Sequence, residues 1–293
     1  MRPEFLYIRR AVAITMILAW AIRPEWVRAA PSYCIQSFEN GAINWSTGQV
    51  MVTGHAQPEI NTEAGPTAMP GSARANAIRN IITILKQIKI SPDLTVGEYA
   101  SAHDVILAGI EKTAQDAVIT QQLYTSAMDV EVKMETRIFG GFLQLVLPDH
   151  IRQIPKITEM KSKPVPEGKS NRPEIPINKI PYTGLVVDAR DLGLDPILYP
   201  VIVSEQGKEI YSSMFVSREF AVQYGVATYL CDMETALSFK RIGSNPLVFK
   251  ALRKADNKTN AVMVSMKDAK SLEKSTERHK FLKECRVVIV ADQ

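Results

Sequence analysis

A proline-rich segment near the middle of the chain limits how this sequence can fold. Residues 148–181 contain seven of the 17 prolines in the 293-residue sequence, among Lys, Glu, Ser and Asn. Proline fixes φ and lacks a backbone N–H group, so this composition favours an extended, semi-rigid spacer over a packed element. We therefore expect a folded module on each side of the segment. A long wrapped loop is the alternative interpretation.

The region before the spacer, 41–147, has the pattern of a small α+β module. Its apolar side chains alternate in some stretches and recur at helical spacing in others. An order of strand, helices and strands predicts a sheet with helices on one face. Gly140 and Gly141 interrupt the pattern before an apolar segment at 142–147. The expected elements are a strand at 44–57, helices at 73–90 and 95–113, and strands at 117–124 and 128–137.

The region after the spacer, 182–293, predicts a second α+β module. Gly207 can adopt positive φ, so it suits the turn of a hairpin. The last expected strand, at 286–291, is too apolar to lie at a solvated edge of a sheet. The fold class expected for the whole chain is thus α+β, with two small sandwich modules joined by the spacer. The expected elements are strands at 184–189, 247–252, 261–265 and 286–291, a hairpin of 200–204 with 208–211, a helix at 232–239 and a helix beginning after Ser265.

The first thirty residues have the pattern of an export signal. Arg2, Arg9 and Arg10 precede the apolar run Ala11–Ile22, and small residues follow near Ala29. A run of this length is too short for a bilayer core, which needs about 20 residues. We expect a signal peptide at 1–29, cleaved after Ala29 by the general secretory route, with twin-arginine export as the less favoured alternative. The predicted location is the periplasm or the outer membrane surface.

The net charge of the chain depends strongly on this segment. The whole sequence has 35 basic and 31 acidic residues. Five Arg and two Glu lie in 1–29, so the remainder has 30 basic and 29 acidic residues. Proteins that bind nucleic acid carry a basic patch or stripe, and this composition does not require one. Nucleic acid is therefore not expected as a partner.

Three cysteines remain after the predicted cleavage, at Cys34, Cys231 and Cys285. An oxidising compartment allows disulfides, and Cys231–Cys285 is the candidate bond within the C-terminal module. Two buried thiols are the interpretation that we favour, and the bond is the alternative. Cys34 follows Pro31-Ser32-Tyr33, which does not match the small residues that precede a lipid-modified cysteine. We therefore expect no lipid anchor at Cys34.

The sequence contains no strong catalytic motif. Its four histidines show no metal-ligand spacing, and it has no nucleophile elbow, P-loop or dinucleotide fingerprint. We predict no catalytic, cofactor or metal residues. The weak site candidate is Asp188, Arg190 and Asp191, directly after a buried strand, where α/β proteins often place acids and bases. An ion pair that stabilises a turn is the structural alternative.

The N-terminal module resembles a known family of envelope proteins. The segments WSTGQVMVTGHA, ARANAIRNIITILKQI and MDVEVKMETRIFGGF are similar to LPP-twenty-type envelope lipoproteins and to the N-terminal domain of flagellar assembly protein T. The resemblance implies an exported, non-enzymatic protein with a structural or assembly role, such as in a surface or flagellar structure. Its partners would be envelope proteins or further copies of the chain. The alternative is a periplasmic enzyme or ligand-binding protein with a site near Asp188, Arg190 and Asp191.

Overall fold

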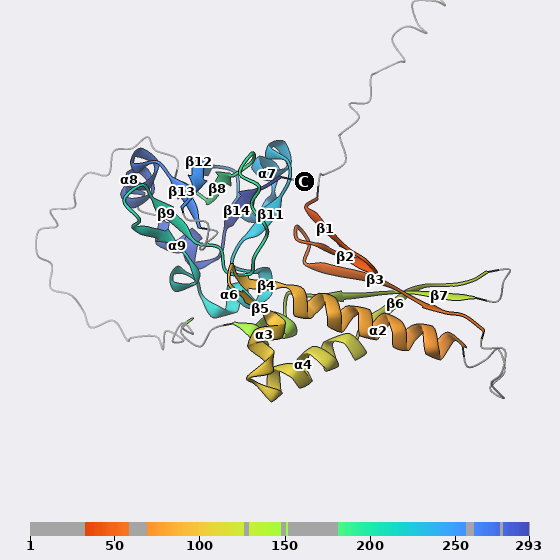
Figure 1. The fold of residues 1–293 in the computed structure, drawn as a ribbon. Coiled ribbons are helices and arrows are strands. Elements are labelled where there is room, and N and C mark those ends of the chain that lie inside the picture. The colour runs from red at the N-terminus through yellow and green to blue at the C-terminus, as the bar shows by residue number, and fades with distance from the viewer. Residues whose placement is uncertain are drawn as a thin grey trace, which may run out of the picture. The chain divides into compact units, whose positions relative to one another are not determined.

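The computed structural model describes most of the chain outside its N-terminus and the spacer. The described residues are 33–58, 69–125, 129–147, 151, 181–255, 261–275 and 278–292. All of them belong to one compact unit, Ser32–Gln293. The predicted signal peptide and most of the proline-rich segment lie outside the described residues. Helices and strands occur throughout the unit, which confirms the mixed α+β class (Figure 1).

An antiparallel sheet of five strands forms the N-terminal part. Its strand order is β1-β2-β3-β7-β6. The long strands β3 and β7 pair along their whole length, from Gln49 opposite Arg137 to Ala56 opposite Val130. The strands are β1 (Ile35–Phe38), β2 (Gly41–Asn44), β3 (Gln49–Ala56), β6 (Val118–Tyr124) and β7 (Val130–Arg137).

One long helix, α2 (Met69–Gln87), packs on this sheet (Figure 1). It contacts β2, β3 and β7. Its buried side chains recur at helical spacing: Ala73, Ala77, Ile81, Ile84 and Leu85. Gly54 on β3 allows the close approach, because a Cβ atom there would lie 2.3 Å from the carbonyl oxygen of Ala73. The remaining helices of this part are α3 (Val96–Ser101), α4 (Asp104–Gln115) and α5 (Gly141–Val146).

The helices differ from the sequence prediction at their ends. The helix α2 begins four residues early and ends at Gln87, because the chain then forms a two-stranded ladder of β4 (Lys89–Ser91) and β5 (Leu94–Thr95). The helix expected at 95–113 is divided into α3 and α4. A reciprocal cap begins α3: the backbone N–H of Glu98 donates to Thr95 Oγ1 (3.2 Å), and the N–H of Thr95 donates to Glu98 Oε2 (2.7 Å).

A mixed sheet of seven strands forms the C-terminal part, in the order β10-β9-β13-β12-β8-β14-β11. The strands β12, β8, β14 and β11 run parallel to one another. All four residues of β14 are buried, as the apolar sequence predicted. The strands are β8 (Gly184–Asp188), β9 (Ile202–Ser204), β10 (Glu209–Tyr211), β11 (Thr228–Leu230), β12 (Pro246–Lys254), β13 (Val262–Val264) and β14 (Val287–Val290).

Short helices surround this sheet. The helix α8 is capped by Ser265, whose hydroxyl accepts from the N–H of Asp268 (3.1 Å), as its sequence indicated. The β9–β10 hairpin is also confirmed, with Gly207 at φ 74°. Sequence patterns did not indicate β11, α6 or α9. The helices are α6 (Arg218–Tyr224), α7 (Met233–Ser238), α8 (Met266–Lys274) and α9 (Arg278–Lys283), with 3-10 turns η2 (Ser213–Phe215) and η3 (Lys240–Ile242).

The two sheets are in direct contact, which the prediction of modules on a spacer did not anticipate. Buried apolar side chains from both parts form one continuous cluster. Tyr33 and Leu230 form an antiparallel bridge, and the Ser46 hydroxyl donates to the carbonyl oxygen of Tyr229 (2.7 Å). The ring of Trp45 meets Tyr229 edge-on at 5.9 Å.

Candidate functional site

The structure places the acidic candidate residues in a turn directly after β8. Arg190 makes a bidentate ion pair with Asp188, with Nε 2.8 Å from Oδ1 and Nη2 2.8 Å from Oδ2. The next residue, Asp191, has a positive φ of 69°. The backbone N–H groups of Asp191 and Gly193 donate to the carboxylate of Asp292 at 2.8 and 2.9 Å. This network holds the turn against the end of β14.

The electrostatics of the turn favour its structural interpretation. The hydrogen bonds from Arg190 lower the pKa of Asp188, and the backbone donors lower the pKa of Asp292. A general acid needs a raised carboxyl pKa, so these two groups are poorly suited to that role. Asp188, Arg190 and Asp191 lie together, as expected, but as an ion-paired turn.

The disulfide differs from the candidate bond. Cys34 is bonded to Cys231, with their Cα atoms 5.2 Å apart, and Cys285 is a free, buried thiol. The candidate bond Cys231–Cys285 is therefore not formed. The observed bond joins the N-terminal part to the C-terminal part beside the Tyr33–Leu230 bridge. Because its sulfur is bonded, Cys34 has no free thiol for a lipid.

Strand direction explains the difference. The parallel pairing of β11 and β14 places Leu230 beside Val290, so Cys231 comes level with Ala291. Cys285 precedes Ala291 by six residues. At about 3.3 Å per residue, the two cysteines lie near opposite ends of these neighbouring strands, roughly 20 Å apart along the strand direction. A disulfide needs Cα atoms within about 7 Å.

The free thiol of Cys285 is expected to have low reactivity. Burial raises the pKa of Cys285 to about 12. Since the thiolate is the reactive form, this cysteine is poorly suited to nucleophilic or redox chemistry. Its buried neighbours include Arg241 and Tyr211.

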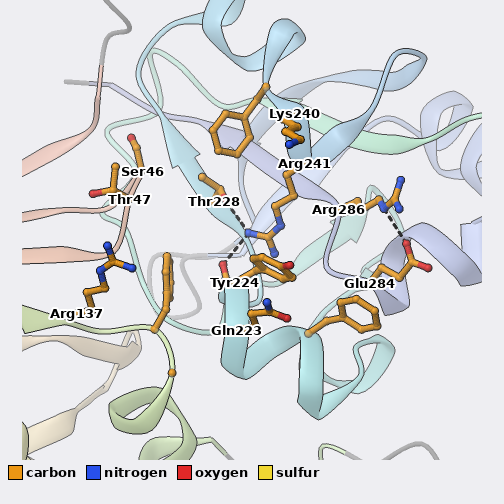
Figure 2. A pocket seen from close by; sticks show the side chains of 14 residues that line it. Ser46, Thr47, Arg137, Gln223, Tyr224, Thr228, Lys240, Arg241, Glu284 and Arg286 are labelled. Atoms are coloured by element: carbon orange, nitrogen blue, oxygen red, sulfur yellow. Dashed lines mark hydrogen bonds and ion pairs between the residues drawn. The ribbon is translucent and has the colours of Figure 1, made fainter.

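A pocket of about 860 Å³ opens where the two sheets meet, and we call it the junction pocket (Figure 2). The N-terminal part contributes the β2–β3 turn and the end of β7. The C-terminal part contributes α6, β11, η3 and the segment before β14. The lining residues are Ser46, Thr47, Arg137, Phe139, Gly140, Phe220, Gln223, Tyr224, Thr228, Phe239, Lys240, Arg241, Glu284 and Arg286.

Two glycines and one aromatic ring shape the junction pocket. A Cβ atom at Gly48 would lie 2.4 Å from the ring of Phe139, and one at Gly225 would lie 2.7 Å from it. Both glycines have positive φ, 72° and 78°. Gly48 lies in the turn between β2 and β3, and Gly225 ends α6. The Phe139 ring therefore fits between turns from both parts of the chain.

The charge of the junction pocket is mainly positive. Arg286 pairs at 2.7 Å with Glu284, the single acidic residue among the described residues of the lining. Among the described residues, Arg137, Lys240 and Arg241 form no ion pair. The guanidinium of Arg241 donates from Nη1 to the Tyr224 carbonyl (2.7 Å) and from Nη2 to the Gly225 carbonyl (2.7 Å). Burial lowers the pKa of Arg241.

A second unusual feature is the edge strand β6. All seven of its residues are exposed, whereas β7 beside it buries alternate side chains. The difference arises because α2 packs on β2, β3 and β7. Val118 and Tyr124, at the two ends of β6, expose 65% and 66% of their surface. The strand has the sequence VITQQLY and carries no charge.

The sequence patterns indicated neither the junction pocket nor the exposed edge of β6. The sequence patterns assigned no role to Arg241, and its partners come from α6, the residue after it and β11, which those patterns did not indicate. The strand β6 was predicted, but its position at an edge was not. The feature of the sequence that could have indicated an open edge is the absence of charge in 118–124, together with its apolar ends.

Among the described residues, no helix is both long enough and apolar enough to span a membrane. The His, Cys, Asp and Glu side chains of the same residues form no group of three or more that suits a metal ion.

Comparison with known proteins relates part of the chain to a described family. Residues 184–293 match the family model for the second domain of Treponema pallidum Tp0624. This segment begins at the first residue of β8 and contains the whole seven-stranded sheet. It covers less than half of the chain and excludes the N-terminal sheet. Comparison with curated proteins gave no match.

Proposed function

We propose that the chain is an exported, non-enzymatic protein of the cell envelope that has a structural or assembly role. It acts through protein–protein contacts, and a second copy of the chain binds at β6. The observation that carries this proposal is the exposed, uncharged edge of β6. The disulfide Cys34–Cys231 supports export, because such bonds persist in oxidising compartments.

The properties of β6 suit strand pairing. An edge strand presents unpaired N–H and C=O groups, and soluble proteins usually protect such edges with Lys, Pro or a short length. The seven residues of β6 include neither Lys nor Pro. A β-bulge lies between Ile119 and Gln121, but the strand continues regularly from Gln121 to Tyr124 opposite β7. The protection of this edge is thus weak.

The sequence of β6 indicates a second copy as the partner. Apolar residues occupy both ends, and Thr120-Gln121-Gln122 occupies the centre. When two copies pair antiparallel about Gln121, the Val118 end of one meets the Tyr124 end of the other. Apolar and aromatic side chains then face one another, and polar side chains meet at the centre. Such cross-strand pairs each contribute about 0.2–1 kcal/mol.

The test changes charges on β6 and measures association. The chain beginning at Ala30 is studied by sedimentation velocity over a range of concentrations. One variant places Lys at Ile119, Gln121 and Leu123, and a second places Glu at the same positions. Because the charges are spread over the strand, the result does not depend on one opposed pair. We expect dimers for the unchanged chain and at least tenfold weaker association for each variant alone.

The mixture of the two variants provides the decisive result. Lys and Glu strands attract one another, so an equimolar mixture should recover the dimer. Val105→Lys serves as the control, because Val105 is 77% exposed on α4, away from this edge. A monomeric unchanged chain, or association that the β6 charges leave intact, would refute self-pairing.

The alternative of an enzyme near Asp188 receives no support from the geometry. Its carboxylate is engaged by Arg190, and its pKa is lowered. Export is tested separately by mass spectrometry of the protein purified from its native envelope. An N-terminus at Ala30 and one intramolecular disulfide are expected. A retained signal segment with reduced Cys34 and Cys231 would contradict export.

A further inference from the structure

The junction pocket contains a partly buried cation, Arg241, without a counter-charge. The hydrogen bonds of Arg241 go to two backbone carbonyl groups and to the hydroxyl of Thr228. All of these acceptors are neutral. Its Nε atom is buried and has no hydrogen-bond partner among the described residues. A buried charge without an opposite charge is costly, so this arrangement favours an anion nearby.

The neighbours of Arg241 do not supply negative charge. Burial raises the pKa of the Cys285 thiol to about 12 and also raises the pKa of the Tyr211 hydroxyl. Both groups are therefore neutral at physiological pH. Of the described residues, Glu284 alone brings a carboxylate to the lining, and Arg286 forms an ion pair with it. The carbonyl groups at the end of α6 explain the orientation of Arg241, but they do not neutralise it.

Two further cations lie at the same pocket. Figure 2 shows Arg137 on the side of the N-terminal sheet, with Lys240 and Arg241 together on the C-terminal part. The side chains of Arg137 and Lys240 are exposed. Three unpaired cations around one cavity produce a local positive potential, which attracts anions. The rest of the chain does not share this excess, since residues 30–293 are nearly balanced in charge.

Aromatic side chains provide the second part of the lining. Phe139, Phe220, Tyr224 and Phe239 all border the cavity. The guanidinium carbon of Arg241 lies 5.6 Å from the centre of the Tyr224 ring, and Tyr224 is 41% exposed. Pockets for small molecules typically combine apolar walls with a few polar groups and have volumes of about 300–1,000 Å³. The volume of about 860 Å³ lies in this range.

We propose that the junction pocket binds a small organic anion, with its phosphate or carboxylate group beside Arg241, Arg137 and Lys240. The apolar portion of the ligand lies against the Phe and Tyr rings. Because residues from both sheets line the pocket, the bound ligand also strengthens the contact between the two parts of the chain. This binding function is separate from pairing at β6, since none of the lining residues belongs to that strand.

Calorimetric titration of the disulfide-bonded chain tests the proposal with defined probes. Phenyl phosphate and benzoate carry a ring with each kind of anionic group, inorganic phosphate lacks the ring, and phenol lacks the charge. We expect at least one of the two aromatic anions to bind at least tenfold more tightly than both inorganic phosphate and phenol. The stronger of the two identifies the anionic group.

Variants locate the binding site. Arg137→Gln combined with Lys240→Gln removes two exposed cations without disturbing the core, and should weaken binding of the preferred probe at least tenfold. The control combines Arg253→Gln with Lys267→Gln, which removes the same charge from exposed positions outside the pocket. Its affinity should remain within twofold of the unchanged chain. Equal losses of affinity in both double variants would indicate non-specific electrostatic attraction and would overturn the proposal. The absence of binding of either aromatic anion at millimolar concentration would also overturn it.

Discussion

The disulfide between Cys34 and Cys231 should contribute strongly to stability, because it closes a very long loop. The two residues are 197 positions apart. The chain-entropy model gives about 5 kcal/mol for a loop of this length, whereas measured effects are typically about 2–4 kcal/mol. We expect Cys34→Ser combined with Cys231→Ser to lower the free energy of unfolding by about 2–5 kcal/mol.

The fold itself should survive this change. The Ser46 hydroxyl still donates to the Tyr229 carbonyl, and the N–H of residue 34 still donates to Ser46 Oγ, at 2.9 Å in the unchanged chain. The Trp45 ring still packs edge-on against Tyr229. The expected loss in thermal midpoint is on the order of 10 °C, since a chain of this size shifts by about 2–4 °C per kcal/mol.

Urea unfolding of the chain beginning at Ala30, with and without reductant, measures the effect. The unchanged chain should lose stability on reduction, whereas the double variant should be insensitive to it. Cys285→Ala is the matched control and should keep the full redox difference. Thiol titration of the unfolded, oxidised chain should find one free thiol. If three thiols titrate, or if Cys285→Ala abolishes the redox difference, the assignment of Cys34 to Cys231 is refuted.

Three further predictions concern single positions. Gly48→Ala should destabilise the protein by more than about 1 kcal/mol, because Gly48 has a φ of 72° and a Cβ atom there would contact the ring of Phe139. Gly71→Ala should instead stabilise it by about 0.5–1 kcal/mol, because Gly71 lies within α2 and a Cβ atom there would have open space. Chemical unfolding of the two variants compares these effects. The pKa of Asp188 is lowered by Arg190, so its contribution to stability is present above an unfolded pKa near 3.8 and is lost as the pH falls through the lower folded value. Asp188→Asn should therefore reduce stability at pH 7, and the difference should shrink below about pH 4; a constant difference would argue against the ion pair. Cys285, with its pKa raised to about 12, should react with iodoacetamide at pH 8 only after unfolding, as followed by mass spectrometry; rapid labelling of the native protein would contradict its burial.

Much of the secondary structure followed from local sequence patterns. The apolar spacing in α2 depends on a period of about 3.6 residues, and the alternation in β7 on a period of two. The hairpin around Gly207 and the cap at Ser265 also involve neighbouring residues only. Such features can be predicted because their causes lie within a few residues. The ends of α2 and the break between α3 and α4 were less predictable, because pairing of β4 with β5 competes with the helix there.

The sequence by itself determined the mixed α+β class, most of the strands and helices, and the apolar faces that form the core. Tertiary structure alone decided that Cys34 bonds to Cys231, that Arg241 lies beneath a cavity lined by both sheets, and that β6 remains at an open edge. These three features depend on strand order and direction, which bring together residues far apart in the chain. Parallel pairing of β11 with β14 separates Cys231 from Cys285, whereas the position of α2 leaves β6 uncovered. No local pattern contains that information, because it arises only when both sheets pack together.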